Sequence, residues 1–171
     1  MGNEIKTENF SVKSFFEKIN LIFHGILAIP LAIFGWLYLE AQNGSQLTVE
    51  DVNMDVLNFI MPFFILGTIG ASIFLFRNRL KLIDSKLLLP EKLDKYLLSS
   101  LIKFAGLELA LILSVVGYYL SYSNTFVAMF VIVLVFFSLS KPTTYRVADA
   151  LRLEGEERDL VINKANEKEI N

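Results

Sequence analysis

The chain of 171 residues is 54% hydrophobic and 20% charged, with a mean hydropathy of +0.51 and a formal net charge of −2. Soluble globular domains are less apolar and carry more charge, so this composition favours a membrane protein. The chain has no cysteine and one histidine, which excludes disulfides, cysteine-ligated metal sites and a metal or haem site that needs several histidines from one chain.

The first two expected membrane spans follow a short polar start. Residues 1–18 hold three lysines and three glutamates and are expected to form a cytoplasmic N-terminal segment. Residues 19–39 and residues 56–76 are then two runs of 21 residues without a charged side chain. Because a spanning helix needs about 20 residues, these runs predict spans at about 19–40 and 56–77.

Residues 109–140 contain no charge, and this run is too long for one helix to cross a bilayer. A single helix of 32 residues would be about 48 Å long, whereas the hydrocarbon core is about 30 Å thick. The Ser-Tyr-Ser-Asn segment at 121–124 favours a turn, because Ser and Asn side chains compete for nearby backbone groups. We therefore predict a tight hairpin there, between a third span at about 97–121 and a short fourth span at about 125–140.

The positions of lysine and arginine predict the topology. Outside the expected helices, basic residues precede the first span, lie between the second and third, and follow the fourth. The loop after the first span and the hairpin at 121–124 have none. Since basic residues stay on the cytoplasmic side of bacterial-type membranes, four spans with a cytoplasmic N-terminus place them all on one side. A three-span topology would put the basic tail at 141–171 outside and break this rule.

The expected fold is therefore an all-α integral membrane protein, with a four-helix transmembrane domain at 19–140 and both termini in the cytoplasm. Its expected location is the inner (cytoplasmic) membrane, as a multi-pass protein embedded in the lipid bilayer. The tail at 141–171 is expected to form two short helices, the first capped by Thr143 or Thr144. A helical hairpin of this size is too small to fold alone, so it should dock on the bundle, on the bilayer surface or on a partner.

Three polar residues inside the expected spans are candidates for function. Glu108 is the first, because a carboxylate inside a spanning helix is costly and is commonly functional. It could couple proton or ion movement, or it could be a structural carboxylate tied to a neighbouring helix. Lys103 is expected to extend its long stem to the headgroups. His24 lies at a similar depth, where it either contacts Glu108 or bonds to a backbone carbonyl or an interfacial water.

Small residues form two stripes that are predicted to let helices approach closely. One stripe lies on the first span and the other on the third. Their members are Gly25, Ala28, Ala32 and Gly35 on the first span, and Gly106, Ala110, Ser114 and Gly117 on the third. Glu108 lies roughly opposite the second stripe, which favours its contact with another subunit.

Enzyme motifs were sought in the sequence, and neither a phosphate-binding loop, a dinucleotide-binding glycine pattern, a zinc-protease motif nor a serine-hydrolase motif is found. The favoured hypothesis is a non-enzymatic subunit, anchor or scaffold of a membrane assembly, acting as a homo-oligomer or with a membrane-protein partner. No cofactor, metal or nucleic acid is expected. The alternative is a small homo-oligomeric transporter or channel with Glu108 as the ion-coupling group. A lipid-modifying enzyme is a third hypothesis, but the clustered Asp and His residues of such chemistry are lacking.

Overall fold

The computed structural model describes residues 11–44 and 53–166, and every regular element in these ranges is an α-helix. The helices are α1 (Val12–Gln42), α2 (Met54–Lys81), α3 (Leu89–Ser121), α4 (Asn124–Leu139), α5 (Thr144–Ala150) and α6 (Gly155–Asn166). The expected N-terminal segment, first loop and tail extend into residues 1–10, 45–52 and 167–171, which lie outside these ranges. For the described part of the chain, the all-α prediction is confirmed.

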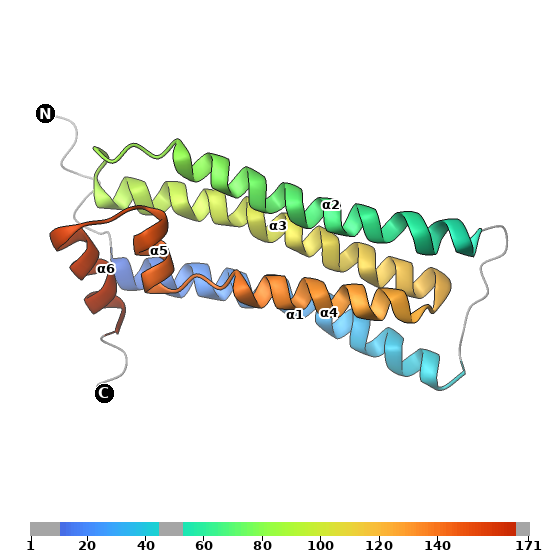
Figure 1. Cartoon of the computed structure of the whole chain (residues 1–171). Helices are drawn as coiled ribbons and strands as arrows, with labels where there is room; N and C mark the ends of the chain where they lie inside the picture. The colour runs from blue at the N-terminus through green and yellow to red at the C-terminus, as the bar shows by residue number, and fades with distance from the viewer. Residues whose placement is uncertain (1–10, 45–52, 167–171) are drawn as a thin grey trace, which may run out of the picture.

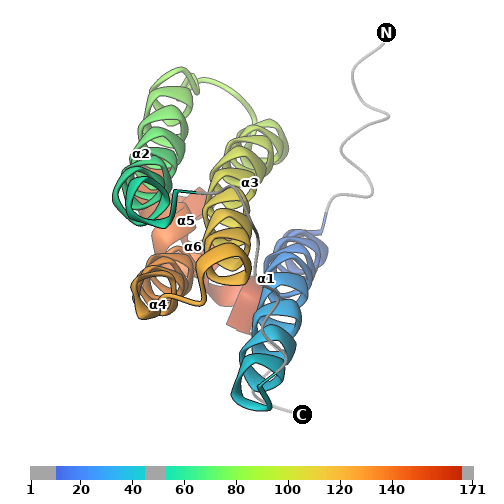
Figure 2. The same cartoon turned by 90° about the vertical axis from the view of Figure 1, so that its right-hand side faces the viewer.

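The four longer helices run side by side, and α5 and α6 gather at one end of them (Figure 1). We call this the basic end, because it contains the start of α1, the turn between α2 and α3, and the cations Arg77, Lys81, Lys141, Arg146 and Arg152. We call the other end the hairpin end, because α3 turns into α4 there. Helix α3 is central: it packs against α1, α2 and α4, and Figure 2 shows it between α1 and α2.

Helices α1, α2 and α3 are each long enough and apolar enough to cross a membrane. Helix α4 has 16 residues and reaches the length of a span only together with α5, from which it is bent by 78°. The described chain therefore has three candidate spans, or four if the bent pair counts as one. Several long apolar helices of this kind are typical of a multi-pass membrane protein.

Side-chain caps and a proline set several helix boundaries. Asn53 Oδ1 accepts a hydrogen bond from the Val56 backbone N–H at 3.2 Å at the start of α2. Thr143, one of the two expected caps, accepts one from the Arg146 N–H at 3.4 Å at the start of α5. Helix α3 has Pro90 in its first turn, where a missing N–H costs nothing. The turn from α3 to α4 centres on Tyr122, whose φ of 49° is left-handed, within the predicted hairpin at 121–124.

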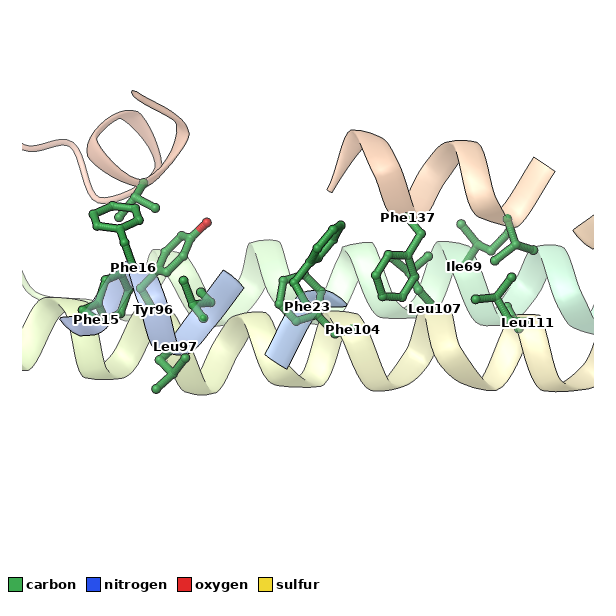
Figure 3. Packing of buried hydrophobic residues seen from close by; sticks show 14 of the residues in the cluster. Phe15, Phe16, Phe23, Ile69, Tyr96, Leu97, Phe104, Leu107, Leu111 and Phe137 are labelled. Atoms are coloured by element: carbon green, nitrogen blue, oxygen red, sulfur yellow. The ribbon is translucent and has the colours of Figure 1, made fainter. Parts of the chain in front are cut away.

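Phenylalanine rings attach α1 to α3 and α4. Phe23 lies 5.4 Å from the Phe104 ring and 4.9 Å from the Phe137 ring, measured between centroids (Figure 3). Nearer the hairpin end, Phe34 stacks on Phe130 at 3.9 Å. Helices in lipid associate through close packing, and these ring contacts attach α1 to α3 and α4.

The tail packs on the other helices, which was one of its three expected docking sites. Val147, Leu153 and Val161 are fully buried. The buried Lys92 Nζ, in the first turn of α3, lies 2.7 Å from the Glu157 carboxylate of α6 and forms an ion pair with it. The tail is therefore fastened to the basic end by apolar contact and by a charged hydrogen bond.

Candidate functional site

Lys103 lies beside the last residues of α4. Its side chain is 8% exposed, and its Nζ donates a hydrogen bond of 3.3 Å to the Ser140 carbonyl. The same ammonium group lies 4.3 Å from the centre of the Phe76 ring. Arg146 donates a hydrogen bond to the Leu139 carbonyl. Two cations thus bind the free carbonyls at the C-terminus of α4, where the helix dipole is negative.

The predicted extension of the Lys103 stem to the headgroups stays a prediction. The described structure adds that its ammonium group lies against the end of α4. The physical reason is local, because carbonyl oxygens and an aromatic face both attract a cation.

A cleft of about 330 Å³ opens beside Lys103, with α3 as its floor and with α2 and the α4–α5 connection as its walls. Four of its lining residues are cations, namely Arg77, Lys103, Lys141 and Arg146. Its apolar lining includes Ile73, Phe76, Phe136 and Leu139. Among the described residues that line it, none is acidic. We call this feature the basic cleft.

A second hollow of about 240 Å³ adjoins the basic cleft. The two share Arg77 and Ala150, and the second adds the cations Lys81 and Arg152. The positive lining therefore continues from the end of α4 across α2 and α5. Clustered charges of one sign raise the local concentration of counter-ions.

Glu108 is half-buried on α3 and is not part of the basic cleft. It follows Phe104 by four residues, so it lies on nearly the same side of α3 as the contact with α1. Within residues 11–44 and 53–163, no hydrogen bond or ion pair of its carboxylate is found. Its neighbours on the next turns, Ala105 and Ile112, are exposed. The carboxylate thus lies at the edge of the α1–α3 contact.

His24 is exposed, and its Nδ1 donates a hydrogen bond of 2.7 Å to the Asn20 carbonyl one turn earlier. It forms no ion pair with Glu108 in the described structure. Of the alternatives for this histidine, the bond to a backbone carbonyl is the one observed. The adjacent Phe23 takes the position that faces α3, which turns the imidazole away from it.

The two small-residue stripes have different surroundings. On α3, Ala110 and Ser114 are fully buried, and a side chain at Gly106 would overlap the Cβ of Ser72 in α2. A side chain at Gly117 would overlap the Phe126 ring of α4. This stripe is therefore covered by α2 and α4.

The α1 stripe faces away from the other helices. Gly25, Ala28, Ala32 and Gly35 are all exposed. A Cβ atom at Gly25 or at Gly35 would meet nothing within 4 Å. At 3.6 residues per turn, the stripe is on the opposite face of α1 from Phe23, which faces α3. Among the described residues, no other helix packs on this stripe, so its role in helix packing stays a prediction for contact with another molecule.

Sequence reasoning missed the basic cleft and the Lys92–Glu157 pair. The sequence singles out Lys103 and predicts a basic cytoplasmic face that could bind anionic headgroups, but it does not place Arg77, Lys141 and Arg146 beside Lys103. A usable signal was the position of Lys141 and Arg146 directly after a helix that is too short for a full span, since cations collect at helix C-termini. No comparable signal links Lys92 to Glu157, because they are 65 positions apart.

Metal clusters were also sought. No group of three or more His, Asp and Glu side chains that could hold a metal ion occurs in the described part of the chain. Comparison of the sequence with protein-family models and with curated proteins, and of the fold with solved structures, finds no match.

Proposed function

We propose that the protein is a non-enzymatic subunit, anchor or scaffold of a membrane assembly. In this proposal it has four spans, with both termini on the cytoplasmic side of the inner membrane. The observation that carries the proposal is the exposed small-residue stripe of α1, a helix-packing surface that none of the described helices covers.

The geometry of α3 and α4 supports a fourth span. Lys103 of α3 meets Ser140 at the end of α4, and the two helices are joined at Tyr122. From Lys103 to Ser121 the helix advances by 18 residue steps and rises about 27 Å, close to the hydrocarbon thickness of about 30 Å. Lys103 would then lie at one membrane boundary and the hairpin at the other.

The clustering of basic residues supports the orientation. Arg77, Lys141 and Arg146 lie at the same end as the docked tail, whereas the described part of the hairpin end has no lysine or arginine. By the positive-inside rule, the basic end would be cytoplasmic.

The α1 stripe supports a role in assembly. Helices in lipid associate through close packing, and small residues allow their backbones to approach. Helix α1 uses its Phe23 and Phe34 side to hold α3 and α4, which leaves the side with Gly25 and Gly35 open. A spanning helix of a partner protein, or of a second copy, would fit against this face.

The test is to block the open face with larger side chains. We expect the double substitution Gly25→Leu and Gly35→Leu to release the assembly, because leucine holds a partner backbone away. Light scattering in nanodiscs would give the mass, and mass spectrometry would identify stoichiometric partners. The matched control is Gly67→Leu with Gly70→Leu in α2, where a Cβ also meets nothing within 4 Å. A wild-type protein that is a monomer without a partner, or equal effects of both pairs, would contradict the proposal.

A second candidate function is supported by Glu108. A half-buried carboxylate on a spanning helix, with neither a hydrogen bond nor an ion pair in the described structure, is a natural proton- or ion-coupling group. In this reading the protein is a small homo-oligomeric transporter or channel.

Glu108→Gln separates the two functions. A transporter would lose proton flux in liposomes while expression and assembly stay unchanged, because glutamine cannot exchange a proton. A subunit would instead show altered assembly or no effect. Glu91→Gln is the matched control, since Glu91 is exposed in the first turn of the same helix.

A further inference from the structure

We infer that the basic cleft binds the phosphate headgroup of one anionic phospholipid. The inference requires that the helices cross a membrane, but it does not depend on the assembly role of α1. Four cations converge on the cleft from α2, α3, the α4–α5 connection and α5, namely Arg77, Lys103, Lys141 and Arg146.

The cations have hydrogen-bond capacity left for a ligand. The side chains of Arg77 and Lys141 are exposed and form no hydrogen bond or ion pair with other described residues. Lys103 and Arg146 each donate to a single backbone carbonyl. Because an ammonium group has three N–H donors and a guanidinium has five, both keep donors for phosphate oxygens. Without an anion, four positive charges around about 330 Å³ repel one another.

The cleft has the polarity of a lipid at a membrane boundary. Ile73 precedes Arg77 by one helical turn on α2, and Phe136 precedes Ser140 by one turn at the end of α4. Both helices run from the hairpin end to the basic end, so the apolar lining lies deeper in the helical body than the cations (Figure 1). A phosphate would contact the cations while the acyl chains extend along α2 and α4 toward the hairpin end.

This arrangement favours a lipid over a free anion. A soluble phosphate would gain nothing from contact with the exposed apolar side chains that continue the cleft. Among these, Phe136 and Leu139 are 39% and 59% exposed. Basic pockets between spanning helices at the membrane boundary are a recurrent way of binding anionic headgroups. Lys81 and Arg152 in the adjoining hollow would also attract the negative charge of the headgroup.

The experiment uses the full chain in nanodiscs of phosphatidylcholine, to which phosphatidylglycerol is added in steps. Native mass spectrometry counts the phosphatidylglycerol molecules that stay bound. Arg77→Gln and Lys141→Gln should each weaken binding about fivefold, since one basic residue near an anionic surface contributes about that factor. The double variant should weaken it about 25-fold if the two act independently. Neither side chain bonds to another described residue, so both variants should fold normally. Circular dichroism would check their helix content.

Controls decide between this inference and its rivals. Arg79→Gln removes an exposed charge from the same turn of α2 but outside the cleft, and should leave binding unchanged. Equal weakening by Arg79→Gln would show attraction to the whole surface and overturn the inference. Equal binding of phosphatidylcholine would do the same. Thermal stabilisation by inorganic phosphate that matches phosphatidylglycerol would assign the cleft to free anions instead.

Discussion

Gly106 lies directly against Ser72 of α2, so its replacement tests the contact between α2 and α3. A methyl group there would overlap the Cβ of Ser72, which is buried and whose hydroxyl donates to the Ile69 carbonyl at 2.8 Å. Because α2 must move to make room, we expect Gly106→Ala to destabilise the fold by about 1–3 kcal/mol, the usual cost of overpacking. Thermal unfolding in detergent, followed by circular dichroism, would measure this.

Gly25→Ala is the matched control for Gly106→Ala. Both residues are glycines inside an apolar helix, but a Cβ at Gly25 meets open space. We therefore expect this change to leave the unfolding temperature unchanged or to raise it slightly, through better helix propensity. Equal destabilisation by the two changes would show that the α2–α3 contact is not as close as described.

The two charged residues within the apolar part of α3 could be identified from the sequence, but their contacts could not. Lys103 and Glu108 stand out because a charge within an apolar run is rare. The sequence does not show that Lys103 meets Ser140 while Glu108 stays without a bonding partner in the described chain. That difference depends on which neighbouring helix faces each side of α3.

At the scale of helices, α6 is attached to α3 by one charged pair that can be broken selectively. Lys92 is 7% exposed and Glu157 is 36% exposed in the pair. We expect Glu157→Gln to weaken the docking of α6 by about 1 kcal/mol, the value of a charge-assisted hydrogen bond discounted for partial exposure. Hydrogen exchange in α6 should speed up about fivefold, since 1.4 kcal/mol corresponds to a factor of ten.

Glu156→Gln provides the control for the α6 experiment. Glu156 has the same chemistry and neighbours Glu157, but it is exposed and forms no ion pair with another described residue. Its replacement should leave exchange in α6 unaltered. If both variants exchanged alike, apolar packing of Val161 and Leu153 alone would hold the tail.

The tail helices α5 and α6 could be predicted from the sequence, but the place where they dock could not. The two tail helices, and a cap at Thr143 or Thr144, follow from local spacing and from side-chain chemistry next to Pro142. The folded chain uses Thr143. The docking of the tail on α1 and α3 required the folded chain, because three docking sites were compatible with the same sequence.

For the whole molecule, the absence of cysteine makes topology directly measurable. We expect Lys86→Cys, in the turn between α2 and α3, to be protected from a membrane-impermeant maleimide in intact cells. Asn43→Cys, at the other end of the helices, should be labelled. Both side chains are exposed, so a difference between them reports the side of the membrane rather than burial.

Membrane disruption controls this labelling experiment. After lysis, Lys86→Cys and Asn43→Cys should react equally. Labelling of Lys86→Cys in intact cells, with protection of Asn43→Cys, would invert the proposed orientation. A third variant, Glu156→Cys in the tail, should follow Lys86→Cys if α4 is a full span, and should be labelled in intact cells if the chain crosses the membrane three times.

The helical class, the three long apolar helices and the turn at 121–124 could all be predicted from the amino-acid sequence. These are local properties, set by the length of an apolar run and by residues that favour turns. The folded chain was needed to show that the α3 stripe is covered and the α1 stripe is open, and that four cations meet at the end of α4. Such features depend on how each helix is rotated about its axis. That rotation is set by contacts such as Phe23 with Phe104, between residues far apart in the chain.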